Sequence, residues 1–565
     1  MFNIKSLFSA GKPGDGVPDN RKAAQQWLDD LSGQDTNTQH QQIIEKLASL
    51  HAPQTSQKSE LQRLEAIDAI DHYAQALQTT LCLQYLNSPR MSQMVEHRLW
   101  NAIYAWYINI SSVYLDHLKA MTAHPELRAP DPLLARLCTR ALYNLGNAFK
   151  WRFLRYDSPD GALWQLLHEL YLTAEQNGFE NQPTPAYDDH LWRCGGLMLR
   201  AEILALSHPG ALTVDQIDVL DNWLLEHTQA LILEKLPNTN RHHYYNDLAE
   251  AHAALPITPQ TWTTTTRAWD MSSLLIQLQR TRNELSLPKT AAPSPVLTQR
   301  QKLLAALTYA EKQWHPHEIG KLRRDIRVKS RQQLSVVHGL SDLYTIIKKQ
   351  SSPAQTLGIN HKSSYQELLD LKMYGFVTNN TRNRQQEIVH AMEMPTLTSN
   401  WETENTSNDG YLVHYPAEAG QWLRLGSLIG VRNTESTAGW SACIVRRLIK
   451  NQQSGAMAGL EILSRNLTPA LLNALQTNPG QASPEQMSFG TAPKNNTCHA
   501  ILTSPVLRGH FTLLLDIANH AQGKNYQFSQ EPGGPPIQLT LGKILHKGDL
   551  WVQVEAEILD TKTTG

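Results

Sequence analysis

Two arginines are the residues best suited to bind a ligand: Arg323 and Arg327, in an R-x-x-x-R arrangement. The planar guanidinium of arginine makes paired hydrogen bonds to phosphate oxygens and to the O6 and N7 acceptors of guanine. Arg324 lies beside the first arginine, and Arg327 begins a second R-x-x-x-R register that ends at Arg331. Because this spacing also arises by chance in basic stretches, the pair needs support from its surroundings.

A polar turn further along the chain gives part of that support. Residues 405–410 read N-x-S-x-x-G, with Asn405, Ser407 and Gly410 at the defined positions. Asn, Ser, Asp and Gly are common in turns of every kind. The turn is therefore informative only together with the strand that is expected to follow it at residues 411–415.

Both stretches lie among short predicted strands. In the segment 328–344, Leu334 and Val336 alternate with Gln333 and Ser335, which is typical of a half-buried strand. Further strands are expected at residues 423–431, 440–450 and 459–463. Five or six short strands at this spacing predict a small antiparallel β-barrel.

The order of these features resembles the PilZ domain family, whose members bind the bacterial second messenger cyclic di-GMP. The resemblance covers residues 321–464. It includes the arginine pair, the N-x-S-x-x-G turn, a W-x-A-x-I-V-R-R strand that ends at Arg446 and Arg447, and a closing G-L-E-I-L strand. A long segment at about 345–394 departs from the family pattern and is expected to be an excursion from a barrel loop.

The resemblance implies a role for each motif residue. Asn405 and Ser407 would bind guanine edges through amide and hydroxyl, and Gly410 would let the base approach the backbone, because glycine has no Cβ and tolerates positive φ. The remaining ligand-binding residues would be arginines: Arg323, Arg327, Arg324 and one of Arg446 or Arg447, since neighbouring strand residues point to opposite faces. Asp325 and Asp409 lie among these groups and would compete for the arginines.

Length and charge bound the remaining possibilities. A chain of 565 residues predicts two to four domains. The 51 basic and 52 acidic residues nearly balance, so charge favours neither a nucleic acid nor a membrane surface as partner. Five scattered cysteines without C-x-x-C spacing indicate a reducing compartment and no structural zinc. No apolar run of about 18 residues occurs, so we expect a cytoplasmic protein without membrane insertion.

Residues 20–290 show helical spacing of apolar side chains. One face between Pro89 and Pro125 repeats at intervals of three and four residues: Leu99, Ile103, Trp106, Ile110 and Val113. Breaks rich in Pro, Gly and Asn leave seven or eight helices, and an antiparallel helical array, tetratricopeptide-like or irregular, is the expected architecture. Residues 238–269 are expected to be a strand or loop insertion. Four tryptophans are expected in the core: Trp100, Trp106, Trp151 and Trp164.

The predicted fold class is multidomain α+β. A flexible leader (1–19) precedes the helical array (20–290), a linker and helix (291–320), the PilZ-like antiparallel β-barrel (321–466) and a C-terminal β-rich domain (495–560). Residues 467–494 are expected to be a connector. In the last strand, Val552, Val554, Ala556 and Ile558 share one face, so the C-terminal region is either a second small barrel or a sheet packed on the first.

These features favour a receptor over an enzyme. The chain has no G-x-x-x-x-G-K-[ST] loop, no G-x-S-x-G elbow and no H-E-x-x-H helix. We expect cyclic di-GMP as ligand, no metal, no nucleic-acid partner and a protein partner that docks on the helical domain. An alternative is a helical scaffold of pilus, flagellar or polysaccharide machinery whose barrel does not bind the ligand.

Overall fold

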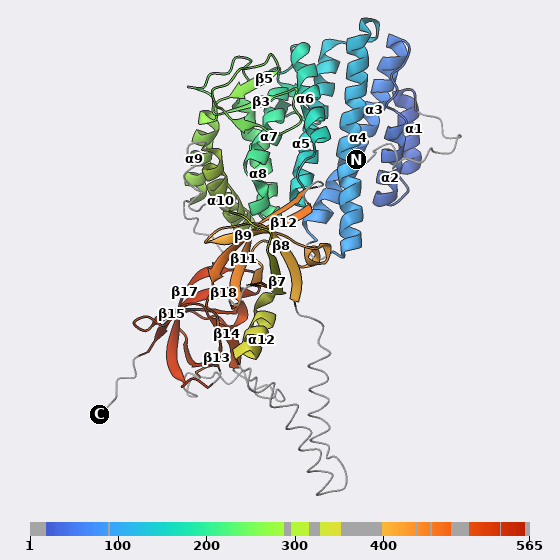
Figure 1. The fold of residues 1–565 in the computed structure, drawn as a ribbon. Coiled ribbons are helices and arrows are strands. Elements are labelled where there is room, and N and C mark those ends of the chain that lie inside the picture. The colour runs from blue at the N-terminus through green and yellow to red at the C-terminus, as the bar shows by residue number, and fades with distance from the viewer. Residues whose placement is uncertain are drawn as a thin grey trace. The chain divides into compact units, whose positions relative to one another are not determined.

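A computed structural model describes residues 18–88, 91–286, 295–315, 328–351, 398–435, 439–451, 455–475, 497–531 and 533–559. Arg323, Arg324 and Arg327 lie outside the described residues, as do residues 1–17 of the expected leader. The chain divides into two compact units, residues 1–324 with 449–453, and residues 325–448 with 454–565. Figure 1 colours the helices of the first unit blue to green and the strands of the second yellow to red. The predicted multidomain α+β fold class is confirmed.

The first unit is a set of antiparallel and crossing helices of unequal length. In the described residues, helices range from 11 residues in α1 to 31 in α4, so the irregular form of the predicted array is the one observed. The helices are α1 (Arg21–Leu31), α2 (Thr36–Ala48), α3 (Gln57–Leu86), α4 (Gln93–Ala123), α5 (Asp131–Leu154), α6 (Gly161–Gln176), α7 (Cys194–Leu206), α8 (Val214–His227), α9 (Ser272–Ser286) and α10 (Pro295–Trp314). None of these helices, within the described ranges, is long and apolar enough to cross a membrane.

Local sequence signals set where many of these helices begin. Six of them start after a side chain that accepts a hydrogen bond from a backbone N–H of the first turn: Asn20, Asp35, Ser56, Ser92, Asp160 and Thr213. Thr213 and Gln216 form a reciprocal capping box at α8. The predicted apolar face of α4 is buried. The four tryptophans expected in the core are also buried, and they belong to the core of the helical unit.

Helix α10 belongs to the core of the helical unit. Ala306, Leu307, Ala310 and Trp314 are fully buried in it, and the indole N–H of Trp314 donates to Ser207 Oγ at 3.0 Å. The expected division that set residues 291–320 apart as linker and helix therefore differs from the packing. The predicted helix is present as α10, but its packing against the other helices depends on contacts that its own sequence does not show.

A small sheet interrupts the helices within residues 238–269, for which the sequence predicts either a strand or a loop insertion. Strands β3 (Tyr244–Asp247), β4 (Leu255–Pro256) and β5 (Thr266–Trp269) pair in the order β4-β3-β5. Two further short strands, β1 (Thr184–Pro185) and β2 (Leu191–Trp192), form a separate pair. The strand alternative for residues 238–269 is confirmed.

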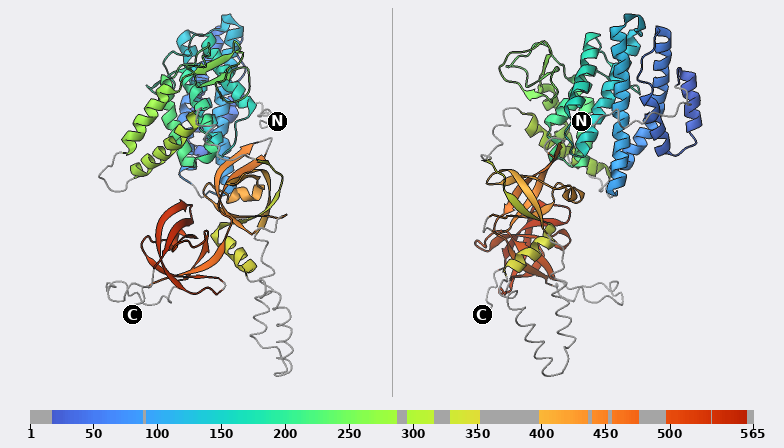
Figure 2. Two further views of the ribbon diagram at one scale, coloured as in Figure 1. Left: turned by 60° about the vertical axis from the view of Figure 1, so that its left-hand side comes forward. Right: turned by 45° about the vertical axis from the view of Figure 1, so that its right-hand side comes forward.

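The middle barrel of the second unit carries the predicted motif turn. Its strands are β6 (Val328–Lys329), β7 (Gln333–His338), β8 (Thr398–Thr406), β9 (Gly410–His414), β10 (Leu428–Asn433), β11 (Ser441–Asn451) and β12 (Gly455–Ser464). They pair in the order β6-β8-β7-β10-β11-β12-β9, and a further pairing of β8 with β9 closes six of them into a ring. Figure 2 (left) looks into this ring, next to that of the C-terminal barrel. The antiparallel barrel is thus confirmed.

The strand expected over residues 328–344 ends at His338. Gly339 has a φ of +79°, which glycine adopts readily, and the chain turns there into helix α12 (Gly339–Ser351). Leu343, Tyr344 and Ile347 recur at helical spacing and are buried. Residues 345–351 of the expected insertion thus belong to α12, and residues 352–397 lie outside the described part of the chain.

Strand β11 is buried on both faces, so its first half shows no alternation of buried and exposed residues. Residues Ser441 to Val445 are all buried. Trp440, Ala442 and Ile444 pack in one cluster with α12 and with residues of the C-terminal barrel such as Ile501, Leu514 and Trp551. Since strand side chains alternate, Cys443 and Val445 point to the opposite face. The two barrels of this unit thus share a core.

The C-terminal region is a second closed barrel. Its strands are β13 (Thr468–Ala474), β14 (Thr497–Leu502), β15 (His510–Asp516), β16 (Asn525–Gln530), β17 (Ile537–Lys547) and β18 (Trp551–Ile558), in the order β13-β14-β15-β18-β17-β16 with β16 paired to β13. Val552, Val554 and Ala556 fill its core as the sequence predicts. The expected connector at 467–494 is wrong at its start, because β13 occupies Thr468–Ala474 and pairs with β14 and β16.

Candidate functional site

The N-x-S-x-x-G motif forms the turn between β8 and β9. Ser407 closes the turn, because its backbone N–H donates to the Gly410 carbonyl at 2.9 Å and its hydroxyl lies 3.4 Å from the same oxygen. Asn405 is in β8 opposite Leu412 of β9, after an irregularity in the register between Thr403 and Asn405. The structure therefore brings Asn405, Ser407 and Gly410 together on one hairpin with half-buried side chains at Asn405 and Ser407.

Gly410 has a packing role that the sequence analysis missed. It is not among the glycines with positive φ. A Cβ at this position would lie 2.0 Å from the Leu460 carbonyl oxygen of β12, with which β9 pairs. No heavy atoms approach so closely without a chemical bond, so any side chain at position 410 would push the two strands apart. Close approach of β12 thus requires glycine at this position, and the expected role of Gly410 in admitting a guanine base stays a prediction.

Strand β6 brings the end of the arginine segment to the motif. Val328 lies opposite Thr406, and Lys329 lies opposite Asn405. Arg327 directly precedes Val328 in the sequence. The pairing places the chain that leaves the R-x-x-x-R segment beside the strand that carries Asn405.

Thr403 holds this short strand in place. Its hydroxyl accepts from the Gln332 N–H at 2.9 Å and donates to the Ser330 carbonyl at 2.7 Å, and its own N–H donates to the Gln332 carbonyl at 3.0 Å. The residue is only 1% exposed. Sequence reasoning missed Thr403, since nothing in the local pattern marks the register irregularity that turns it toward residues 330–332.

We expect Thr403→Val to loosen residues 328–332 and to destabilise the barrel. Valine has nearly the same shape but leaves the half-buried Gln332 N–H without its acceptor. An unsatisfied donor costs up to about 1–3 kcal/mol when buried. Hydrogen exchange at residues 328–332 should quicken several-fold, and the melting temperature should fall by a few degrees. Thr403→Ser keeps the hydroxyl and serves as the matched control. If hydrogen exchange at residues 328–332 is as slow in the valine variant as in the serine variant, the Thr403 hydroxyl does not hold β6.

Arg446 and Arg447 are both exposed and lie on β11. The Arg446 Nε donates to Glu461 Oε2 at 2.5 Å, and its NH2 group lies 3.0 Å from His546 Nδ1. Burial and the Arg446 guanidinium lower the pKa of His546, against the opposing effect of Glu461. Arg446 therefore has protein partners that a ligand phosphate would have to displace, and its role in binding stays a prediction.

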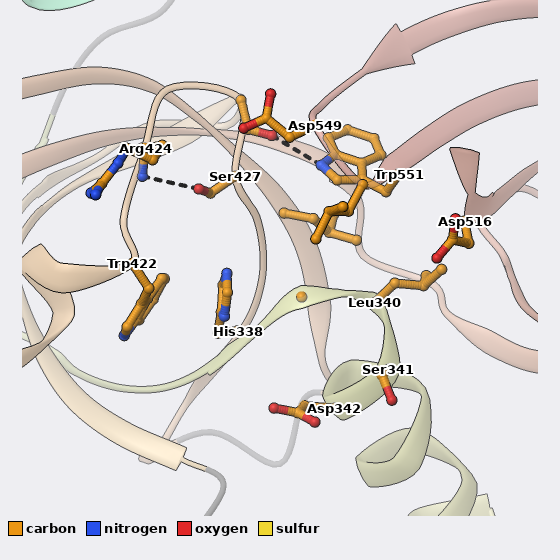
Figure 3. A pocket seen from close by; sticks show the side chains of 14 residues that line it. His338, Leu340, Ser341, Asp342, Trp422, Arg424, Ser427, Asp516, Asp549 and Trp551 are labelled. Atoms are coloured by element: carbon orange, nitrogen blue, oxygen red, sulfur yellow. Dashed lines mark hydrogen bonds between the residues drawn. The ribbon is translucent and has the colours of Figure 1, made fainter. Parts of the chain in front are cut away.

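A cavity of about 410 Å³ lies away from the motif turn, between the middle and C-terminal barrels (Figure 3). The rings of His338 and Trp422 face each other at 4.1 Å between centroids. Burial lowers the pKa of His338, partly offset by Asp342. The indole N–H of Trp551 donates to the Gly426 carbonyl at 2.9 Å and links the two barrels at its edge. The lining includes none of the predicted ligand-binding residues.

Metal ligation finds no support in the parts of the chain that the structure describes. There, no three or more His, Cys, Asp or Glu side chains are placed to hold one metal ion.

Two family models match the chain. Residues 22–238 match the N-terminal domain of the cyclic-di-GMP receptor FimW, and residues 359–469 match the middle PilZ domain of the same receptor. The first match covers most of the helical unit, and the second includes the β8–β9 turn. No curated protein and no solved structure matches the chain.

Proposed function

Because the chain belongs to the PilZ family and carries a large helical domain before its barrel, we propose that it is a receptor that binds cyclic di-GMP at the β8–β9 turn. Arg323 and Arg327 would hold the ligand from the segment before β6, with Arg324 between them. Asn405 and Ser407 would read the guanine edges. Arg446 would release Glu461 to add a phosphate contact.

The pairing of β6 with β8 carries this proposal. Val328 and Lys329 lie opposite Thr406 and Asn405, so the segment with the arginines enters the barrel at the motif strand. Arg323 lies five positions before Val328, so its Cα is at most about 18 Å from that of Val328. Both arginines can therefore reach a ligand seated at residues 405–410.

The chemistry of the ligand fits these groups. Cyclic di-GMP has two phosphates and two guanines. Arginine forks make bidentate bonds to phosphate oxygens, pair with guanine O6 and N7 and stack on purine rings. Amide and hydroxyl groups can donate to and accept from the remaining guanine edge.

Isothermal titration of the full-length protein with cyclic di-GMP tests the proposed function. We expect saturable binding, with cyclic di-AMP and GTP binding far more weakly because cyclic di-AMP has no guanine and GTP has only one. Binding can occur without measurable heat, so a titration that shows no heat is followed by equilibrium dialysis. If dialysis also shows no binding, the receptor function is rejected and the helical scaffold with a non-binding barrel is favoured.

We further propose that the helical domain transmits the signal. Residues 316–327 connect α10, which ends at Trp314, to β6, which begins at Val328. The segment that would hold the ligand is therefore also one of the covalent links between the two units. Ordering it narrows the orientations that the link allows, and a ligand shifts such an equilibrium by its differential affinity for the two states.

Ligand binding is accordingly expected to change the distribution of distances between the two units. A coupling of about 1–3 kcal/mol is the usual scale, enough to alter the pair-distance profile in small-angle scattering. If cyclic di-GMP binds and the profile stays the same, the output runs through the barrel surface instead. The protein partner that we place on the helical domain, the cytoplasmic location and the absence of catalysis belong to the same proposal.

A further inference from the structure

Arg465 lies against the motif turn from the side opposite to β6. It directly follows β12 (Gly455–Ser464). Its NH2 group donates to the main-chain carbonyl of Asn408 at 2.5 Å, and its NH1 group lies 3.4 Å from the Tyr411 hydroxyl. Asn408 is inside the N-x-S-x-x-G turn, so an arginine outside the recognised motifs touches the motif itself.

The barrel topology puts a basic residue on each side of this turn: Lys329 of β6, opposite Asn405, and Arg465 after β12. Strand β8 pairs with β6, whereas β9 pairs with β12. The β8–β9 hairpin is thus flanked by β6, with Lys329, on one side and by Arg465 on the other. A cyclic dinucleotide carries its two phosphates on opposite sides of one ring, which matches cations that approach from two directions.

Arg465 also keeps its charge available. Its two hydrogen bonds go to a carbonyl and a phenol, both neutral, and no acidic side chain pairs with it among the described residues. Arg446 differs, since its guanidinium is paired with Glu461 at 2.5 Å. Arg465 is exposed to solvent, and a guanidinium has five N–H donors. It can keep the Asn408 carbonyl and still donate a pair of hydrogen bonds to an anion.

We infer that Arg465 is a ligand-contacting residue that binds one phosphate of the dinucleotide held at the β8–β9 turn. The inference rests on the proposed function and adds to it a fixed contact on the barrel. The hydrogen bond to Asn408 orients the guanidinium before the ligand arrives, so less side-chain freedom is lost on binding.

Titration of four proteins with cyclic di-GMP tests this role: wild type, Arg465→Ala, Arg465→Gln and Arg508→Ala. Loss of a hydrogen bond to a charged group predicts a Kd about 10- to 100-fold higher for both Arg465 variants. Glutamine can still donate to the Asn408 carbonyl, so its variant separates loss of charge from loss of the turn contact. Arg508→Ala removes an exposed arginine of the same unit and should bind like wild type.

The outcomes separate this inference from the proposed function. Failure of the wild-type protein to bind would reject both. If wild type binds and the Kd of the Arg465→Gln variant lies within twofold of the wild-type Kd, the role of Arg465 is overturned. The proposed receptor function would then still stand. If the Arg465→Ala variant melts lower than wild type, its weaker binding has a second explanation, and the Arg465→Gln variant is the test. A phosphate contact then requires that the glutamine variant binds cyclic di-GMP more weakly than wild type and melts at the same temperature.

Discussion

Arg327→Ala protein is expected to bind cyclic di-GMP with roughly 30-fold or more loss in Kd. Truncating one partner of a desolvated charged contact costs about 2–5 kcal/mol, and each 1.4 kcal/mol is about tenfold in affinity. Arg327 directly precedes the strand that pairs with the motif, so we expect its loss to be as large as that of Arg323. Isothermal titration of Arg323→Ala and Arg327→Ala against wild type measures both effects.

A third variant decides which arginine register is used. Arg331 completes the second R-x-x-x-R register with Arg327, and the structure places it after β6 in an exposed position. If the first register holds the ligand, Arg331→Ala should lose far less affinity than Arg323→Ala. Arg280→Ala, an exposed arginine of α9, controls for the loss of one charge. Wild-type affinity in both Arg323→Ala and Arg327→Ala would remove these residues from the site.

Gly410→Ala is expected to lower the stability of the second unit strongly. The added Cβ would lie 2.0 Å from the Leu460 carbonyl oxygen, and that oxygen belongs to the backbone of a paired strand, so it cannot rotate away. Overpacking of this kind typically costs about 1–3 kcal/mol, occasionally more. For a unit of this size each kcal/mol lowers the melting temperature by about 2–4 °C. Differential scanning calorimetry measures the shift.

Gly439→Ala is the matched control for this prediction. Gly439 is an exposed glycine of the same unit, and no atom lies within 4 Å of the position that its Cβ would take. Its replacement should leave the melting temperature nearly unchanged. Equal melting of the two variants would show that β9 and β12 can separate without cost, and the glycine would then be free to serve the ligand.

Local signals explain what the sequence could predict. Asn20, Asp35 and Ser56 cap helices through neighbouring backbone groups, and such contacts are visible within four residues of sequence. The apolar repeat of α4 and the alternating face of β18 work in the same way. The order of the arginine pair, the turn and the closing strand carried the family resemblance.

Contacts between distant segments explain what the sequence could not predict. Ser441–Val445 is buried on both faces because a second barrel covers one of them, and no pattern within β11 reports that barrel. The packing role of Gly410 depends on Leu460, and Thr403 acts on residues about 70 positions earlier. Strand β13 contains Pro469, which local propensity reads as a break, although pairing with two strands makes it part of the C-terminal barrel.

Hydrogen exchange with and without cyclic di-GMP tests the central claim most directly, because it locates the ligand on the chain. If the arginine segment and the motif turn form one site, residues 323–332 and 405–411 should gain protection together, at ligand concentrations that follow the same Kd. The cavity between the two barrels is the rival site. Binding that protects residues 338–342 and 422–428, with no change at residues 405–411, would contradict the account.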